Sequence, residues 1–268
     1  MTQQSSTRHS DTFAVVTGGT QGLGMAIAKR LAQDGAAGIV VSGRDPEKGR
    51  AAAKDISSLG TDCRFIKADV SRVDECELLI QKSIDAFGRV NALVNSAALP
   101  SRGTLLETTP ELWEAHMNTN ARGPMLTMKA LVSHLKETGR PGSIVNIISM
   151  AAHCGQPFLT AYSTSKGALV TLSRNVANAY AADHIRCNGI MTGWMDTPGE
   201  NQTQQDFHDA PDDWLVEAEK GQPMGQLVKP DEVAGLASFL LSPESGVITG
   251  SIIDFDQVVR GAYPTSGR

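Results

Sequence analysis

Short runs of apolar residues alternate along the chain with longer stretches in which apolar residues recur at helical spacing. Several short runs have apolar residues at consecutive positions, as strands covered by helices on both faces require. This alternation is typical of βαβ units in a parallel sheet. The predicted strands are 13–17, 39–42, 64–66, 92–94, 143–148, 186–190 and 251–254. The predicted helices are 22–34, 46–59, 73–87, 110–137, 162–182 and 230–241.

These elements predict an α/β fold in which a seven-stranded, mostly parallel sheet carries helices on both faces. The chain has 268 residues, a length that suits one large domain with a substantial core. We expect a single domain over 11–268, preceded by a polar, disordered tail over 1–10.

Segment 196–223 interrupts the alternation of strands and helices, because it is too long and too polar for an ordinary connection in a compact domain. The segment contains three apolar residues that suit burial, Phe207, Trp214 and Leu215. They favour a small helical lid over a disordered insert. We expect this lid to become ordered when ligands bind, with the glycines near its two ends as hinges.

Composition and charge exclude several classes of partner. The formal net charge of -5 leaves no positive excess to hold a nucleic acid. No run of apolar residues is long enough to span a membrane. The first residues lack the apolar core of a signal peptide, and Cys63, Cys76, Cys154 and Cys187 form no CxxC pair. We expect a reduced, cytoplasmic protein with free thiols, no metal site, and a small molecule as its substrate.

A glycine-rich segment, TGGTQGLG, follows the first predicted strand and leads directly into a helix. Its glycines Gly18, Gly22 and Gly24 have the spacing GxxxGxG. Glycines there permit a tight turn and let a pyrophosphate approach backbone N–H groups, while the helix N-terminus adds partial positive charge. The segment predicts a dinucleotide site. A glycine-rich turn without a ligand is the alternative, because the spacing differs from GxGxxG.

Tyr162 and Lys166 form a YxxxK pair, which a helix places on one face about one turn apart. A lysine near a phenol favours the phenolate, so the tyrosine pKa falls from ~10 toward the operating pH and the side chain can exchange protons. A tyrosine and a lysine on a helix surface are the alternative. The pair follows the strand sequence GSIVNIIS, whose last residue, Ser149, lies 13 residues before Tyr162.

The order of these motifs resembles that of the short-chain dehydrogenase/reductase family over nearly the whole chain. Asp69-Val70, the segment NSAA at 95–98, Asn120 and the segment IRCNGIMTGWMDTP also resemble family motifs. The resemblance implies a Rossmann-type, doubly wound sheet and an NAD(P)-dependent oxidoreductase. The residues that it implies for cofactor binding are Gly18, Thr20, Gln21, Gly22, Leu23, Gly24, Arg44, Asp69, Val70, Asn95, Ala97, Tyr162, Lys166, Gly193, Met195 and Thr197.

The resemblance also implies roles in hydride transfer between a nicotinamide and a secondary alcohol or ketone. Tyr162 would exchange a proton with the substrate oxygen, and Lys166 would hold the nicotinamide ribose and lower the Tyr162 pKa. Ser149 would hydrogen-bond the substrate oxygen, and Asn120 would hold a water that links Lys166 to solvent. Taken singly, Ser149 and Asn120 would be ordinary polar residues at a strand end and within a helix.

Three positions depart from the family pattern. Ala98 stands where glycine is usual, Thr192 replaces the proline before Gly193, and Asp256-Gln257 replaces a frequent Gly-Gly pair. The first two would slightly reshape the nicotinamide pocket. The third concerns a C-terminal turn that can reach the substrate mouth or a subunit contact. None of them removes a group that performs the reaction.

The end of the second strand, VVSGRD, bears on the choice of cofactor. In NAD-preferring relatives a carboxylate at this point binds the adenosine ribose and repels a 2′-phosphate, whereas this chain has Gly43. Arg44 follows, with a guanidinium suited to a 2′-phosphate, and Ser42 adds a hydroxyl. Two features argue for NAD. Many NADP-preferring relatives carry a second basic residue at the position of Gln21, and Asp45 could turn back to the ribose. We expect NADP(H), with NAD(H) as the alternative.

Other functions stay open at this point. A non-catalytic, cofactor-binding regulatory protein of the same fold is the main alternative, although the intact catalytic residues argue against it. Related enoyl reductases use a longer Tyr-to-Lys spacing, and an epimerase or dehydratase would need a longer chain. The polar lid favours a hydroxylated substrate such as a sugar or polyol. His153 could face the substrate or solvent, and His208 lies among acidic residues where solvation is favoured over a metal.

We expect a homotetramer, as the resemblance implies, paired through the long helices 110–137 and 162–182. Their outer faces carry more apolar residues than one core face requires. The apolar residues are Met117, Met125, Met128 and Leu131 on the first helix and Leu169, Leu172, Val176 and Ala179 on the second. Packing of all these residues inside one subunit is the alternative.

Overall fold

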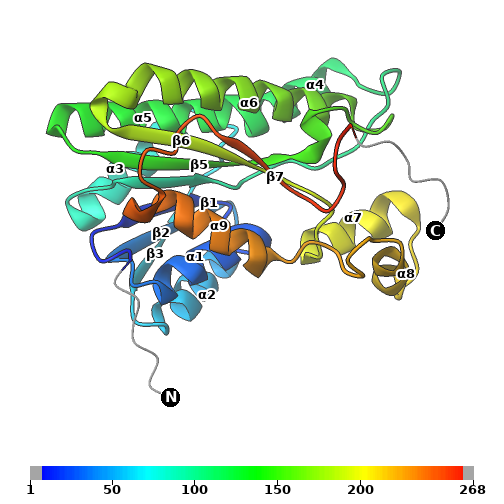
Figure 1. Cartoon of the computed structure of the whole chain (residues 1–268), viewed down its shortest axis with the longest axis horizontal. Helices are drawn as coiled ribbons and strands as arrows, with labels where there is room; N and C mark the ends of the chain where they lie inside the picture. Colours follow the sequence, from blue (N-terminus) through cyan, green and yellow to red (C-terminus); the bar gives the residue numbers. More distant parts are fainter. Residues whose placement is uncertain (1–7, 262–268) are drawn as a thin grey trace.

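Seven strands lie side by side in one sheet in the computed structural model, which describes residues 8–261 (Figure 1). Their order is β3-β2-β1-β4-β5-β6-β7, and every neighbouring pair is parallel. The expected doubly wound α/β sheet is confirmed, with all pairs parallel rather than most. The strands are β1 (Phe13–Thr17), β2 (Gly38–Gly43), β3 (Asp62–Lys67), β4 (Ala92–Asn95), β5 (Gly142–Ser149), β6 (Ile185–Thr192) and β7 (Ile252–Phe255).

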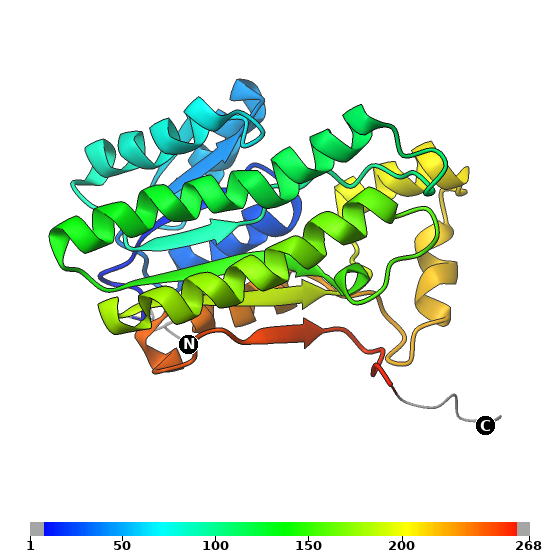
Figure 2. The ribbon, with the colours of Figure 1, turned by 90° about the horizontal axis from the view of Figure 1, so that it is seen from above.

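Helices cover both faces of this sheet (Figures 1 and 2). Successive side chains of a strand point to opposite faces, so Val16 packs in one core layer and its neighbour Val15 in the other. The first layer contains α1 (Gly22–Gln33), α2 (Pro46–Ser57) and α9 (Pro230–Leu241). The second contains α3 (Val73–Phe87), α5 (Gly123–Thr138) and α6 (Thr160–Tyr180).

Several helices start where a capping side chain precedes a proline. Asp45 accepts the N–H groups of the first turn of α2, and Thr109 caps α4 (Pro110–Met117) in the same way. Such caps satisfy backbone donors that have no partner in the helix, and proline suits the first position because it lacks an N–H group. The sequence thus encodes these starts locally.

The predicted helix 110–137 is continuous but changes geometry midway. Helix α4 passes into a π-helical turn at Asn118–Arg122 and then into α5. Single π turns within α-helices are rare and often mark functional sites. This one contains Asn120, whose side chain is fully buried.

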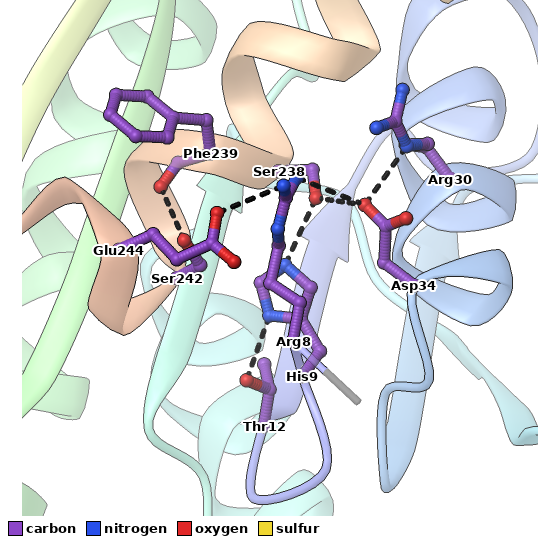
Figure 3. Close-up of polar contacts among 9 residues, drawn as sticks. All are labelled: Arg8, His9, Thr12, Arg30, Asp34, Ser238, Phe239, Ser242 and Glu244. Carbon is purple, nitrogen blue, oxygen red and sulfur yellow. Dashed lines mark hydrogen bonds and ion pairs between the residues drawn. The ribbon is translucent and has the colours of Figure 1, made fainter. Parts of the chain in front are cut away.

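The expected disorder of 1–10 is wrong for its last residues, whereas 1–7 lie outside the described residues. His9 is fully buried, and its Nε2 atom lies 3.0 Å from the hydroxyl oxygen of Ser238 on α9 (Figure 3). Ser238 in turn donates to a carboxylate oxygen of Asp34, just after α1, at 2.5 Å. These contacts anchor the segment before β1 between α1 and α9.

The same contacts define the protonation of His9. Ser238 has one hydroxyl hydrogen, which it gives to Asp34, so Nε2 of His9 must be a donor. The other ring nitrogen lies 2.9 Å from the Thr12 hydroxyl, which can donate to it. Burial lowers the pKa of His9, and nearby charges oppose that shift only in part. A neutral ring satisfies all of these observations.

Segment 196–223 forms two helices beyond the carboxyl edge of the sheet, α7 (Pro198–His208) and α8 (Trp214–Lys220) (Figure 1). Trp214 is buried and stacks on Trp194, with ring centroids 5.8 Å apart. Phe207 is 50% exposed, so its expected burial is wrong.

The burial of residues on the long helices bears on the expected homotetramer. Met128, Leu131 and Leu169, which were assigned to an outer face, are core residues, so they give no argument for an interface and the homotetramer stays a prediction. Within 8–261, no helix is both long enough and apolar enough to cross a membrane.

Candidate active site

A cleft of about 1440 Å³ lies at the carboxyl edge of the sheet. Strands β2 and β3 lie on one side of β1, whereas β4 to β7 continue on the other. The loops after β1 and β4 therefore diverge, and such switch points form the ligand-binding crevice of open α/β sheets. Loops that follow β1, β2, β3, β4, β5 and β6 all contribute to the wall.

The glycine loop after β1 is tightly packed on its protein side. A methyl group on Gly18 would lie 2.8 Å from Cα of Ala97, and one on Gly24 would lie 2.3 Å from the carbonyl oxygen of Gly18. Gly22 differs: it has a φ of +52°, and nothing lies within 4 Å of a methyl group placed there. The loop is therefore open on the side where a phosphate would approach the backbone.

Helix α1 begins at this opening without a side-chain cap and without an acidic residue in its first turn. The first N–H groups of a helix need acceptors and carry partial positive charge. Gln21, Leu23 and Gly24 line the cleft here. The diphosphate of a dinucleotide would supply the missing acceptors, so the residues present fit that cofactor.

The residues after β2 fit a 2′-phosphate better than a free ribose. Asp45 directs one carboxylate oxygen at the N–H groups of Glu47 and Lys48, at 2.8 and 3.2 Å, so it caps α2 rather than turning back. Arg44 and Lys48 both line the cleft, and the hydroxyl of Ser42 is buried with no partner within 8–261. Lys48 was not predicted, although it lies in the first turn of the predicted helix 46–59, close to Arg44 in the sequence.

Asp69, after β3, also lies on the wall, next to Val70. One oxygen of its carboxylate accepts the N–H and hydroxyl of Ser71, at 3.0 and 2.8 Å. These two bonds fix the orientation of the carboxylate at the edge of the cleft.

Tyr162 and Ser149 meet on the opposite part of the wall. Ser149 is the last residue of β5, and Tyr162 lies in the first turn of α6. Burial raises the pKa of Tyr162, and so does the charge of Glu200, while the Ser149 hydroxyl and the charge of Arg102 lower it. The expected depression of the Tyr162 pKa by Lys166 is therefore not what this structure gives, since desolvation dominates.

Lys166 lies one turn further along α6 and is almost completely buried, at 2% exposure. Its Nζ atom donates to the carbonyl oxygen of Ile147 at 2.8 Å and lies 5.9 Å from the centroid of the Tyr162 ring. Burial lowers the pKa of Lys166 to about 8. The lysine is thus a desolvated cation beneath the tyrosine.

Asn120 and Asn95 lie behind the cleft wall. The Asn120 amide bonds both backbone groups of Leu99 and donates to the hydroxyl of Ser165 at 3.0 Å. The Asn95 amide donates to Asn146 at 2.9 Å within the core. Both side chains hold protein segments together, so the cofactor contact expected for Asn95 does not come from its amide.

Most other predicted site residues lie together on the wall. The predicted residues that line the cleft are Gly18, Thr20, Gln21, Gly22, Leu23, Gly24, Arg44, Asp69, Val70, Ala97, Ser149, Tyr162, Gly193, Met195 and Thr197. His208 also lines it, whereas His153 pairs with Asp254 at 3.1 Å and lines a separate small pocket. Across residues 8–261, no group of three or more metal-ligating side chains is found.

Several residues on the wall near Tyr162 were not predicted from the sequence. They are Arg102 and Phe158 from loops, together with Glu200 near the start of α7. Arg102 stacks on Phe158, and Trp194 donates to Glu200 at 2.8 Å. No motif or periodicity marks such residues in the sequence.

The chain matches known proteins along most of its length. A family model described as enoyl-(acyl carrier protein) reductase matches residues 18–257. The 3-oxoacyl-[acyl-carrier-protein] reductase FabG of Chlamydia muridarum is 32% identical over 244 residues, which are 91% of this chain and 95% of that protein. Dehydrogenase/reductase SDR family member 4 of Oryctolagus cuniculus is 34% identical over 257 residues, or 94% of this chain and 93% of that protein. This chain belongs to the short-chain dehydrogenase/reductase family.

A solved structure supports the assignment. The crystal structure of a variant actinorhodin polyketide ketoreductase with NADPH has a TM-score of 0.87 and 29% identity to this chain, and the match covers 92% of this chain and 97% of that one. The expectations of a Rossmann-type fold and of an oxidoreductase of this family are confirmed.

The three departures from the family pattern have visible surroundings. Ala98 lines the cleft, and Thr192 donates its hydroxyl to the carbonyl oxygen of Ile148 at 3.3 Å. The side chain of Asp256 lies over Gly193, where a methyl group would approach it to 2.3 Å. This short-chain dehydrogenase/reductase therefore needs a glycine at 193 to accommodate Asp256.

Replacing Lys166 with Met should stabilise the protein without cofactor at neutral pH. An unfolded lysine keeps its proton to a pH of ~10.4, whereas folded Lys166 loses it above about 8. The unfolded state thus binds more protons between these values, so the wild-type free energy of unfolding rises with pH there, by at most ~3 kcal/mol. The Lys166→Met variant lacks this rise.

Urea unfolding of both proteins from pH 7 to pH ~10.5 measures the difference. The variant should be more stable at pH 7, and its advantage should shrink as the pH rises. Titrations of cysteine and tyrosine occur in both proteins and cancel in the comparison. Parallel pH profiles would show that Lys166 pays no desolvation cost.

Proposed function

We propose that this chain transfers a hydride between a nicotinamide cofactor and the carbon of a ketone or secondary alcohol. The observation that carries the proposal is that Tyr162 and Ser149 line the same cleft, where Ser149 lowers the pKa of the Tyr162 hydroxyl. Two hydroxyl groups on the same part of the wall can both bond a single substrate oxygen. That arrangement suits a carbonyl oxygen, which develops negative charge during reduction.

Each side chain has a role that follows from its contacts. The bound cofactor supplies or takes the hydride. Tyr162 gives its proton to the carbonyl oxygen in reduction and takes it back in oxidation. Ser149 donates a second hydrogen bond and orients the carbonyl. Lys166 places positive charge beneath Tyr162 and would hold the ribose, and Asn120 fixes the neighbouring backbone through Leu99.

We propose NADP(H) as the preferred cofactor. Gly43 offers no carboxylate to a ribose, and Asp45 is committed to capping α2. Arg44 and Lys48 supply two cations to the same part of the cleft. The polyketide ketoreductase whose fold matches this chain was solved with NADPH, which agrees with this preference.

Reduction of a carbon–carbon double bond is the competing reaction, because the matching family model is described by that activity. The four-residue spacing of Tyr162 and Lys166 favours carbonyl reduction, since related enoyl reductases use a longer spacing. The names of the FabG relative and of the polyketide ketoreductase also indicate reduction of a carbonyl group in those proteins.

The substrate half of the cleft favours a small polar molecule. Glu200, Gln204 and His208 of α7 line it, and the His208 ring packs edge-on against Phe158 with centroids 5.4 Å apart. A sugar or polyol is one class that fits these groups. We propose that α7 and α8 act as the lid over this substrate.

The Tyr162→Phe variant should lose turnover by about 100-fold or more, because only the proton-transfer hydroxyl is removed. Cofactor binding should survive. NADPH absorbance with a panel of ketones and aldehydes measures the first effect, and calorimetry with NADP⁺ measures the second. Tyr180→Phe removes a hydroxyl from the far end of α6 and serves as the control. Near-normal turnover of Tyr162→Phe would refute the mechanism.

The Arg44→Ala and Lys48→Ala variants should each lower kcat/KM for NADPH by about tenfold, because each removes a charge-assisted contact with the 2′-phosphate. Their kcat/KM for NADH should change little. Arg50→Ala, an exposed cation of α2 outside the cleft wall, is the matched control. A wild-type preference for NADH, or an NADPH preference that neither variant affects, would contradict the cofactor assignment.

A further inference from the structure

Arg102, in the loop after β4, is a desolvated cation on the cleft wall. Its side chain is 13% exposed, and its Nε atom is buried with no hydrogen-bond partner in residues 8–261. The carboxylate paired with it is that of Glu200, whose Oε1 lies 3.8 Å from Nη2. That separation is an ion pair but is too long for a hydrogen bond.

An arginine with these contacts lacks the hydrogen-bond acceptors that a purely structural arginine would have. A guanidinium group has five donors in a plane, and burying it without acceptors costs free energy. Burial lowers the pKa of Arg102 despite the neighbouring charge of Glu200, so these surroundings disfavour the cation. An acceptor from outside the chain would complete the site.

Arg102 is also oriented and placed for a ligand. Its guanidinium lies 4.8 Å from the centroid of the Phe158 ring, and stacking on that ring holds the plane of the donors. The positive charge of Arg102 lowers the pKa of the Tyr162 hydroxyl. Arg102 therefore belongs to the substrate end of the cleft, beside the proposed proton donor, and not to the adenosine end near Arg44.

Glu200 does not need Arg102 to satisfy its charge. Its Oε1 atom accepts hydrogen bonds from Nε1 of Trp194 at 2.8 Å and from Nε2 of Gln204 at 2.6 Å. A second anion could therefore take the donors of Arg102 without leaving Glu200 unpaired. The geometry leaves the donors of Arg102 available to a substrate.

We propose that Arg102 binds a carboxylate of the substrate, which makes the substrate a small oxo acid or the corresponding hydroxy acid. The proposal rests on the proposed carbonyl reduction for its placement beside Tyr162. A planar carboxylate matches the fork of an arginine. A dianionic phosphate fits less well, because Glu200 lies close by and Glu111 and Glu114 also line the cleft.

The test compares 4-oxopentanoate and 5-oxohexanoate with their methyl esters as substrates of the full chain with NADPH. The acids should have the higher kcat/KM. In Arg102→Met, which keeps much of the packing on Phe158, the acid-to-ester ratio of kcat/KM should fall about 10- to 100-fold, the effect of losing hydrogen bonds to a charged group. Arg102→Lys keeps the charge without the fork and should fall between.

Two further variants separate binding from structural support. Arg140→Met removes an exposed cation far from the cleft and should leave the ratio at its wild-type value. Glu200→Gln removes the competing anion and should lower KM for the acids relative to the esters. A purely structural role of Arg102 would instead affect acids and esters equally, and that result would overturn the proposal.

Calorimetry of 5-oxohexanoate with the enzyme loaded with NADP⁺ tests the site without turnover. Binding that Arg102→Met weakens would support the proposal even if no ketone were reduced, a result that would refute only the proposed function. Reduction of the esters without any preference for the acids would refute the carboxylate site and leave the proposed function intact. Preference for glycerone phosphate over both oxo acids would also contradict the carboxylate assignment.

Discussion

The side-chain amides of Asn95 and Asn146 bond one another at the centre of the sheet, where both residues are buried. Thr127 of α5 donates to Asn95, and Asn146 donates to Ser173 of α6, each at 2.8 Å. Leaving such buried polar groups unpaired costs about 1–3 kcal/mol each. A slip of β4 against β5 by one residue would break this chain of hydrogen bonds. The hydrogen bonds therefore fix the register of the two strands.

The site depends on that register. The end of β5 carries Ser149 to the carboxyl edge, and Ser173 docks α6 against the same strand two turns after Lys166. A second anchor, the bond from Asn120 to Ser165, ties α6 to the π-helical turn. Tyr162 and Ser149 meet because both of their elements are held by buried polar contacts. The buried charge of Lys166 opposes stability, so the packing around it must offset that cost.

The sequence predicted the regular elements well because local chemistry sets their limits. Helices α3 and α9 and strand β1 begin and end at the predicted residues. Gly88, with a φ of 75°, ends α3 in a left-handed conformation, and Pro230 starts α9. The motif glycines, Ser149 and Tyr162 were predictable for the same reason: each has a fixed place relative to a strand end or a helix start.

The failures share a different cause, which is contact between residues distant in the chain. His9 looked like part of a polar tail, yet its partner Ser238 is 229 residues away. Helical spacing showed that Met128 and Leu131 share a face, but not that the sheet covers it. Arg102 belongs to no motif, and only the folded loop places it beside Phe158 and Tyr162.

One isotopic measurement tests whether this chain delivers a hydride to a carbonyl carbon. NADPH that carries deuterium at the transferable position of the nicotinamide is supplied with cyclohex-2-enone, which offers both a carbonyl and a carbon–carbon double bond. Mass spectrometry and NMR then locate the label in the product. We expect the unsaturated alcohol with deuterium on the carbinol carbon. A saturated ketone labelled at the β-carbon, or a product without label, would contradict this expectation.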